Sequence, residues 1–104
     1  MENNDVFKVI CGDFFRRQRV IKEGKAHSGV IIAYTLINEM MLTALDKIYT
    51  DSGCYRPDIR RVLLHDFATN TGYANSKLRD VISHNTYNNY KKMAKNALMK
   101  LLQI

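Results

Sequence analysis

Residues 28–49 read SGVIIAYTLINEMMLTALDKIY, and they form the only segment of the chain apolar enough to be the centre of a small core. Apolar side chains recur at helical spacing over most of its circumference, which leaves a polar stripe at Thr35, Glu39, Thr43 and Asp46. Polar residues interrupt the segment, so no run reaches the ~18–20 apolar residues that a membrane span needs. We therefore expect a central helix that contacts more than one neighbour.

The size and composition of the chain indicate one ordered globular domain. A chain of 104 residues should bury roughly 60–65% of its unfolded surface, and the hydrophobic content of 46% is typical of ordered proteins. Cys11 and Cys54 match no zinc or redox spacing, and the N-terminal segment lacks the basic-then-apolar pattern of a signal peptide. We therefore expect a cytoplasmic protein that carries no metal or cofactor.

The net charge of +6 is distributed unevenly along the chain. Residues 1–52 carry seven Lys or Arg and seven Asp or Glu, whereas residues 53–104 carry nine against three. No acidic residue follows Asp80. A half this basic favours a polyanionic partner such as nucleic acid.

Four further helices are predicted around the central one, so the expected fold is all-α, a compact bundle of about five helices in a single domain over residues 1–104. The first spans residues 4–22 and buries Phe7, Ile10, Cys11, Phe14 and Ile21. Ser28 is expected to cap the central helix. Later helices are predicted over residues 57–68, 75–82 and 83–104, the first of them opened by Pro57 and the last capped by Ser83.

The last predicted helix has two chemically distinct faces. Tyr87, Tyr90, Ala94, Ala97, Leu98 and Leu101 share the apolar face. The opposite face carries Asn85, Asn88, Asn89, Lys92, Lys95, Asn96 and Gln103. This division predicts that the helix packs on the body of the protein and presents amides and ammonium groups to solvent.

No enzymatic motif is found in the sequence. It contains no phosphate-binding glycine loop, no nucleophile elbow and no paired Cys–His metal spacing. The three histidines, His27, His65 and His84, are isolated from one another. We therefore expect a protein that is not an enzyme.

The predicted helices of residues 57–104 match the parts of a helix-turn-helix module, in which a short supporting helix precedes a recognition helix. Asn pairs bidentately with adenine and Lys with guanine, so the last helix suits a major groove. We expect bases to be read by His84, Asn85, Asn88 and Asn89. The residues expected to contact phosphates are Lys77, Arg79, Lys91, Lys92 and Lys95, with Arg56, Arg60 and Arg61 flanking the groove. Residues 1–50 then supply the core and the helices available for dimerisation.

The stretch from Ile82 to Tyr90, ISHNTYNNY, resembles the start of the recognition helix in LuxR/GerE-type regulators and in sigma-factor-like helix-turn-helix regions, whose pattern is I-S-x-x-T-V-x-N-H. Ser83, Thr86 and Asn89 match the Ser, Thr and Asn of that pattern, while Tyr87 stands where it has Val. The resemblance implies a DNA-reading role for the neighbouring residues of the helix start. It implies, with the charge, a DNA-binding transcription regulator of bacterial or phage type.

Two other interpretations are open. An Asn- and Lys-rich face is also what a simply solvated helix presents. Alternatively, a small basic helical protein of phage or mobile-element type could inhibit a host protein or nucleoprotein complex by direct binding, with Phe15, Met40, Met41 and Met99 as adaptable contacts. In either role a homodimer is expected, because a lone small module generally needs a second half-site for useful DNA affinity.

Overall fold

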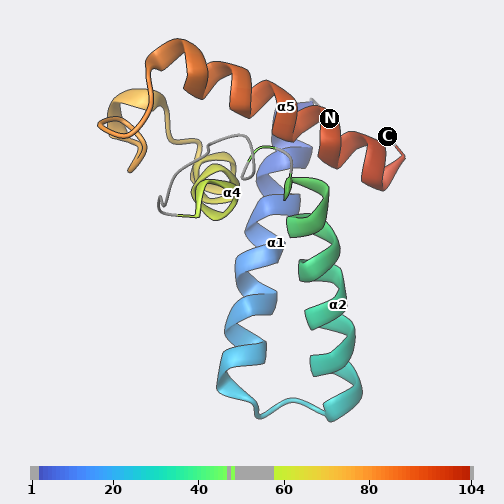
Figure 1. Cartoon of the computed structure of the whole chain (residues 1–104). Helices are drawn as coiled ribbons and strands as arrows, with labels where there is room; N and C mark the ends of the chain where they lie inside the picture. Colours follow the sequence, from blue (N-terminus) through green and yellow to red (C-terminus); the bar gives the residue numbers. More distant parts are fainter. Residues whose placement is uncertain (1–2, 47, 49–57, 104) are drawn as a thin grey trace.

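A computed structural model of the whole chain describes residues 3–46, 48 and 58–103, and its elements within those ranges are all helical. They are α1 (Asn3–Glu23), α2 (Ser28–Ala44), α4 (Ile59–Thr69), the short 3₁₀ helix η1 (Tyr73–Asn75) and α5 (His84–Leu102). Helices α1 and α2 form an antiparallel hairpin, and α5 lies across the end of that hairpin remote from its tip (Figure 1). Each helix in the described ranges is too short or too polar to cross a membrane.

Three helices agree with the prediction to within two residues at each described end. The expected spans of residues 4–22, 57–68 and 83–104 are found as α1, α4 and α5. Five residues of the sequence analysis lie outside the described residues. They are Pro57 and Ile104, at the edges of these spans, Tyr49, the expected end of the central helix, and Arg56 and Cys54.

Ser83 is the N-cap of α5, as predicted, since its Oγ accepts a hydrogen bond of 3.1 Å from the backbone N–H of Thr86. The cap predicted for α2 is wrong by one residue. His27 occupies that position, and its Nδ1 accepts a 3.0 Å hydrogen bond from the backbone N–H of Gly29. An imidazole nitrogen can therefore replace the hydroxyl that we expected from Ser28.

The short helix predicted over residues 75–82 does not form. The 3₁₀ helix η1 is followed there by a series of turns. Side chains take over the backbone groups that a helix would pair, because Ser76 Oγ accepts from the N–H of Leu78 at 3.1 Å. The hydroxyl of Tyr73 lies 2.5 Å from the carbonyl oxygen of Arg79 and 2.7 Å from that of Ile82. Its O–H group is the donor to these two oxygens.

The core is shared between α1, α4, α5 and the second half of residues 28–49, which contributes Met41, Leu42, Leu45 and Ile48, so only part of the predicted central segment enters it. Helix α1 packs along α4 on one side and along α2 on the other. The buried apolar residues include Phe7, Cys11 and Phe14 of α1, Ile59, Leu63 and Leu64 of α4, and Tyr87, Ala94 and Leu98 of α5. Only the C-terminal end of α2, with Met41 and Leu42, enters this cluster. Most of α2 instead packs a narrow stripe on α1.

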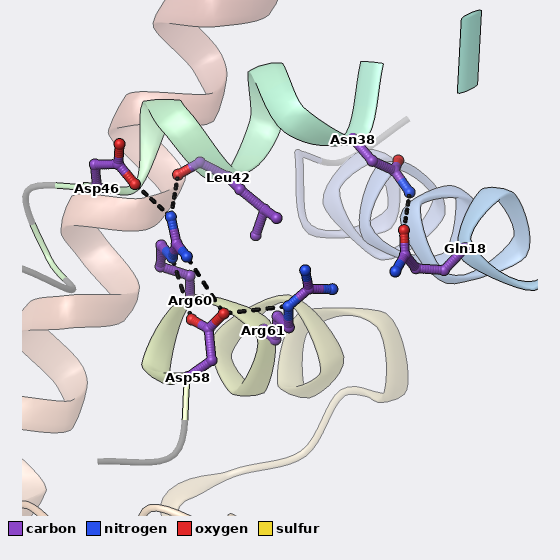
Figure 2. A network of polar contacts seen from close by, with 7 residues as sticks. All are labelled: Gln18, Asn38, Leu42, Asp46, Asp58, Arg60 and Arg61. Atoms are coloured by element: carbon purple, nitrogen blue, oxygen red, sulfur yellow. Dashed lines mark hydrogen bonds and ion pairs between the residues drawn. The ribbon is translucent and has the colours of Figure 1, made fainter. Parts of the chain in front are cut away.

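A buried amide fixes how α2 lies on α1. Asn38 is 3% exposed, and its Nδ2 donates to the carbonyl oxygen of Phe14 at 3.0 Å and to Oε1 of Gln18 at 3.1 Å. Its Oδ1 accepts from Nε of Arg17 at 2.7 Å. Figure 2 shows the pair formed by Asn38 and Gln18. Because a slipped register would leave this amide buried without partners, Asn38 specifies one alignment of the two helices.

Candidate nucleic-acid interface

Helix α5 presents a continuous polar surface, which we call the α5 outer face. It consists of the exposed residues Asn85, Asn88, Asn89, Lys92, Asn96 and Lys100. Tyr87, Ala94 and Leu98, on the opposite side of the helix, are buried. The two-faced helix that the sequence predicts is therefore present. The α5 outer face contains amides and ammonium groups and no carboxylate.

Three further polar residues lie at or before the start of α5. Lys77 and Arg79 are exposed in the turns that precede the helix, and His84 is exposed in its first turn. The ring of His84 stacks on that of Tyr73, with centroids 4.8 Å apart and an interplanar angle of 15°. Nη1 of Arg79 lies 3.4 Å from the carbonyl oxygen of Ala74, which holds the arginine over its own loop. Lys77 and Arg79 add two positive charges before the helix N-terminus, beside the exposed carboxylate of Asp80.

A buried carboxylate anchors this surface to the body of the protein. Asp66 of α4 is 1% exposed, and its Oδ2 accepts hydrogen bonds from Ser76 Oγ at 2.6 Å and from the hydroxyl of Tyr87 at 2.8 Å. Burial, followed by the contact with Asp66, raises the pKa of the Tyr87 hydroxyl. Two segments that contribute to the candidate interface, the turns and α5, are thereby tied to α4.

Lys91 does not lie on the α5 outer face, although we expected it to contact phosphate. Its Nζ is 3.3 Å from the carbonyl oxygen of Thr71, and it sits 5.0 Å from the ring centroid of Phe67 and 5.4 Å from that of Tyr87. Desolvation lowers the pKa of Lys91, and the negative charge of Asp66 partly opposes that shift. Lys91 is therefore part of the packing between α5 and α4.

Three other predicted basic residues, Lys95, Arg60 and Arg61, are also engaged within the protein. Nζ of Lys95 lies 5.5 Å from the ring centroid of Phe7 on α1. Arg60 pairs with Asp58 at 3.1 Å and with Asp46, and its Nη1 lies 3.3 Å from the carbonyl oxygen of Leu42 (Figure 2).

Arg61 likewise pairs with Asp58 at 3.1 Å. Arg60 and Arg61 neutralise carboxylates of α4 and of the segment that follows α2. The fold does not add them to the α5 outer face.

Sequence reasoning missed three residues that shape this region: Tyr73, Ser76 and Asp66. A signal for Asp66 was present, because it stands three residues after Leu63 and seven after Ile59, on the stripe of α4 that faces the core. An acid on such a stripe indicates a buried carboxylate with partners. Tyr73 and Ser76 give no comparable signal, since they lie in or beside irregular turns and their contacts depend on tertiary geometry.

The described residues hold no group of His, Cys, Asp and Glu side chains suited to a metal ion. Cys11 is fully buried, and burial raises the pKa of its thiol to about 12. No family model, curated protein or solved structure matches the chain.

Proposed function

We propose that this protein binds duplex DNA through the α5 outer face and acts as a DNA-binding regulator of bacterial or phage type. One observation carries the proposal. After His84, the exposed residues of the 19-residue helix α5 as far as Lys100 are all Asn or Lys, in a chain that contains ten acidic residues elsewhere. An exposed helix of this kind suits the width of the DNA major groove.

The residues divide into two roles in this proposal. Asn85, Asn88 and Asn89 offer the paired donor and acceptor that adenine presents in the major groove, and they lie in the first half of α5. Lys92 and Lys100 reach phosphates along the same groove, and their charges need no particular sequence. The amides therefore supply sequence preference and the lysines supply affinity.

The sugar-phosphate backbone of the DNA would be contacted by Lys77, Arg79 and His84, beside the place where α5 enters the major groove. Their exposure at the start of α5 supports this role. The local similarity of residues 82–90 to LuxR/GerE-type recognition helices supports the same orientation of α5. The segment between α4 and α5 consists of η1 and turns, so in this proposal α5 enters the groove without the short supporting helix that a helix-turn-helix would place there.

Binding of random duplex DNA over a salt series tests the proposal with a charge-matched control. The Lys92→Ala/Lys100→Ala variant loses two charges from the α5 outer face, and Arg19→Ala/Lys22→Ala loses two exposed charges from α1. We expect the first variant to bind more weakly and to have a salt slope shallower by up to about 2, since each phosphate contact contributes roughly −0.9. The α1 variant should bind as the parent does.

Equal losses in the two variants would mean that only net charge matters and would contradict the assignment to α5. A duplex RNA of the same sequence provides a second comparison. The A-form major groove is too narrow for a helix, so RNA should bind more weakly than DNA. Tighter binding of RNA would show that the ligand class is wrong.

A further inference from the structure

Helix α2 exposes an apolar surface, which Leu101 at the end of α5 borders beside Leu36 and Met40. Of the seven large apolar residues exposed in the described part of the chain, five lie on α2: Val30, Ile32, Leu36, Ile37 and Met40. Ile32, Leu36 and Met40 are 60%, 59% and 56% exposed. Single exposed apolar residues are ordinary, but a contiguous group on one helix marks an interaction site.

The exposed residues of α2 follow the spacing of a coiled-coil seam. Five exposed residues follow one another at intervals of four, three, four and three positions: Gly29, Ala33, Leu36, Met40 and Thr43. This alternation places them on one line along the helix, opposite the buried residues Asn38 and Met41. We call these five residues the α2 seam. A seam of this spacing accepts another helix, packed lengthwise.

The seam is complementary in shape to itself when two copies run antiparallel. In such a pair, the register that sets Ala33 against Leu36 of the partner subunit also sets Gly29 against Met40 of the partner subunit. Each large side chain then meets a small one, which allows the two helices to approach closely. Beside the seam, Val30 meets Ile37 of the partner subunit, so the apolar contact continues on that flank.

The charge of α2 fits the same arrangement. Glu39 is the single charged residue of α2, and it is exposed beside the seam. In the antiparallel register it lies near the first turn of the partner's α2, where free backbone N–H groups carry positive partial charge. Lys25 precedes that turn and is exposed. A parallel pair would instead keep each Glu39 about 13 Å along the axis from the first turn of the partner's α2.

We propose that two copies of this chain pair through the α2 seam as an antiparallel, two-fold symmetric helix pair. The occupant of the apolar face of α2 is thus a second copy of α2, with Leu36 and Met40 at the centre of the contact and Glu39 at its rim. This inference goes beyond the proposed DNA binding and does not depend on it.

Sedimentation of the full-length protein without nucleic acid, from about 1 to about 200 μM, tests the pairing. We expect a dimer that dissociates on dilution, and we expect Leu36→Asp/Met40→Asp to raise the dissociation constant at least 100-fold. Val9→Asp is the matched control, because Val9 is 52% exposed on α1 and lies off the seam. Both changes are at exposed positions, so circular dichroism should report unchanged helix content.

Disulfide cross-linking tests the direction and the register, in a Cys54→Ser background that leaves Cys11 buried. A mixture of Ile32→Cys and Glu39→Cys proteins should form a mixed disulfide, because these positions face each other across the antiparallel pair. Glu39→Cys alone should not cross-link, since the two positions are then about 13 Å apart along the axis, beyond the reach of a disulfide.

Three results would overturn the inference. A monomer at every concentration would show that no second copy binds. A dimer that Leu36→Asp/Met40→Asp leaves intact would show that another surface pairs. Efficient cross-linking of Glu39→Cys alone, or none between Ile32→Cys and Glu39→Cys, would show that the antiparallel register is wrong.

Discussion

The hydroxyl of Tyr87 donates a 2.8 Å hydrogen bond to Oδ2 of Asp66, although 21 residues separate them in the chain. Both groups are almost fully buried, and Ser76 Oγ shares the same carboxylate oxygen. The carboxylate therefore joins α4, the turns after η1 and α5 at one point. The position of the α5 outer face relative to the core depends on this contact.

Tyr87→Phe should lower the free energy of unfolding by about 1.5–3 kcal/mol, because it removes a buried hydrogen bond to a charged group. Denaturant unfolding measures this loss. Tyr90→Phe on the same helix is the control, since its hydroxyl has no hydrogen-bond partner among the described residues. A loss of equal size in both variants would show that packing of the ring, and not the bond to Asp66, is responsible.

Ser83→Ala should destabilise the protein by about 1 kcal/mol through the loss of the α5 N-cap. Amide hydrogen exchange should accelerate first in the opening turn of α5. Ser28→Ala should change the unfolding free energy by less than about 0.5 kcal/mol, because His27 caps α2. The reverse order of effects would contradict both cap assignments.

The thiol of Cys11 should make stability fall at high pH. Its pKa is raised from 9.0 to about 12 by burial, so above pH 9 the unfolded chain loses a proton that the folded chain keeps. Below pH 9 both forms are neutral and no dependence is expected. Between pH 9 and pH 10 the unfolding free energy should fall by about 1 kcal/mol more than in Cys11→Ala. Parallel pH profiles of the two proteins would contradict the shift.

Two adjacent lysines should differ in their effect on DNA binding. Lys92→Ala should weaken binding to all sequences alike, because Lys92 is exposed on the α5 outer face. Lys91→Met should leave affinity unchanged within about twofold, because its ammonium group faces Thr71 and the rings of Phe67 and Tyr87. Fluorescence anisotropy with one labelled duplex measures both. A larger loss in Lys91→Met would contradict the proposed interface.

Asn88→Ala should relax the base preference at one position of a selected site by about 1–3 kcal/mol, while binding to random DNA stays the same. Selection of bound sequences from a random pool, followed by competition with single-base variants, measures this change. Asn96→Ala is the control, since Asn96 lies two turns further along the α5 outer face. Identical selected sites for parent and Asn88→Ala would remove Asn88 from the base-reading group.

The sequence predicted helices well where one pattern decided the outcome. In α5, the cap residue, the apolar stripe and the polar face all predict the same helix. The helix begins one residue after the predicted cap, Ser83. Over residues 75–82 the apolar residues also have helical spacing, but turns are stabilised instead, because Tyr73 donates to backbone carbonyls and Ser76 Oγ accepts from a backbone N–H. Such bonds depend on tertiary geometry and leave no periodic signal.

Periodicity also could not show what covers an apolar face. The pattern of residues 28–49 correctly indicates a wide apolar surface, yet in one copy of the chain Leu36 and Met40 remain exposed. For the candidate interface, the exposure of Asn85, Asn88 and Lys92 follows from helical phase. The inward positions of Lys91 and Arg60 do not, because they depend on Thr71 and on Asp46, which other segments supply.

Helix α5 crosses the hairpin at the end remote from its tip, with its apolar side toward the core (Figure 1). An antiparallel α2 pair would therefore place its two α5 outer faces, the proposed DNA-binding surfaces, at opposite ends and directed away from each other. Such a dimer is bivalent but cannot place both surfaces on neighbouring half-sites of one palindrome. If both proposals hold, it would bridge two separate stretches of duplex, and its effect on a genome would be to close loops or to gather distant segments.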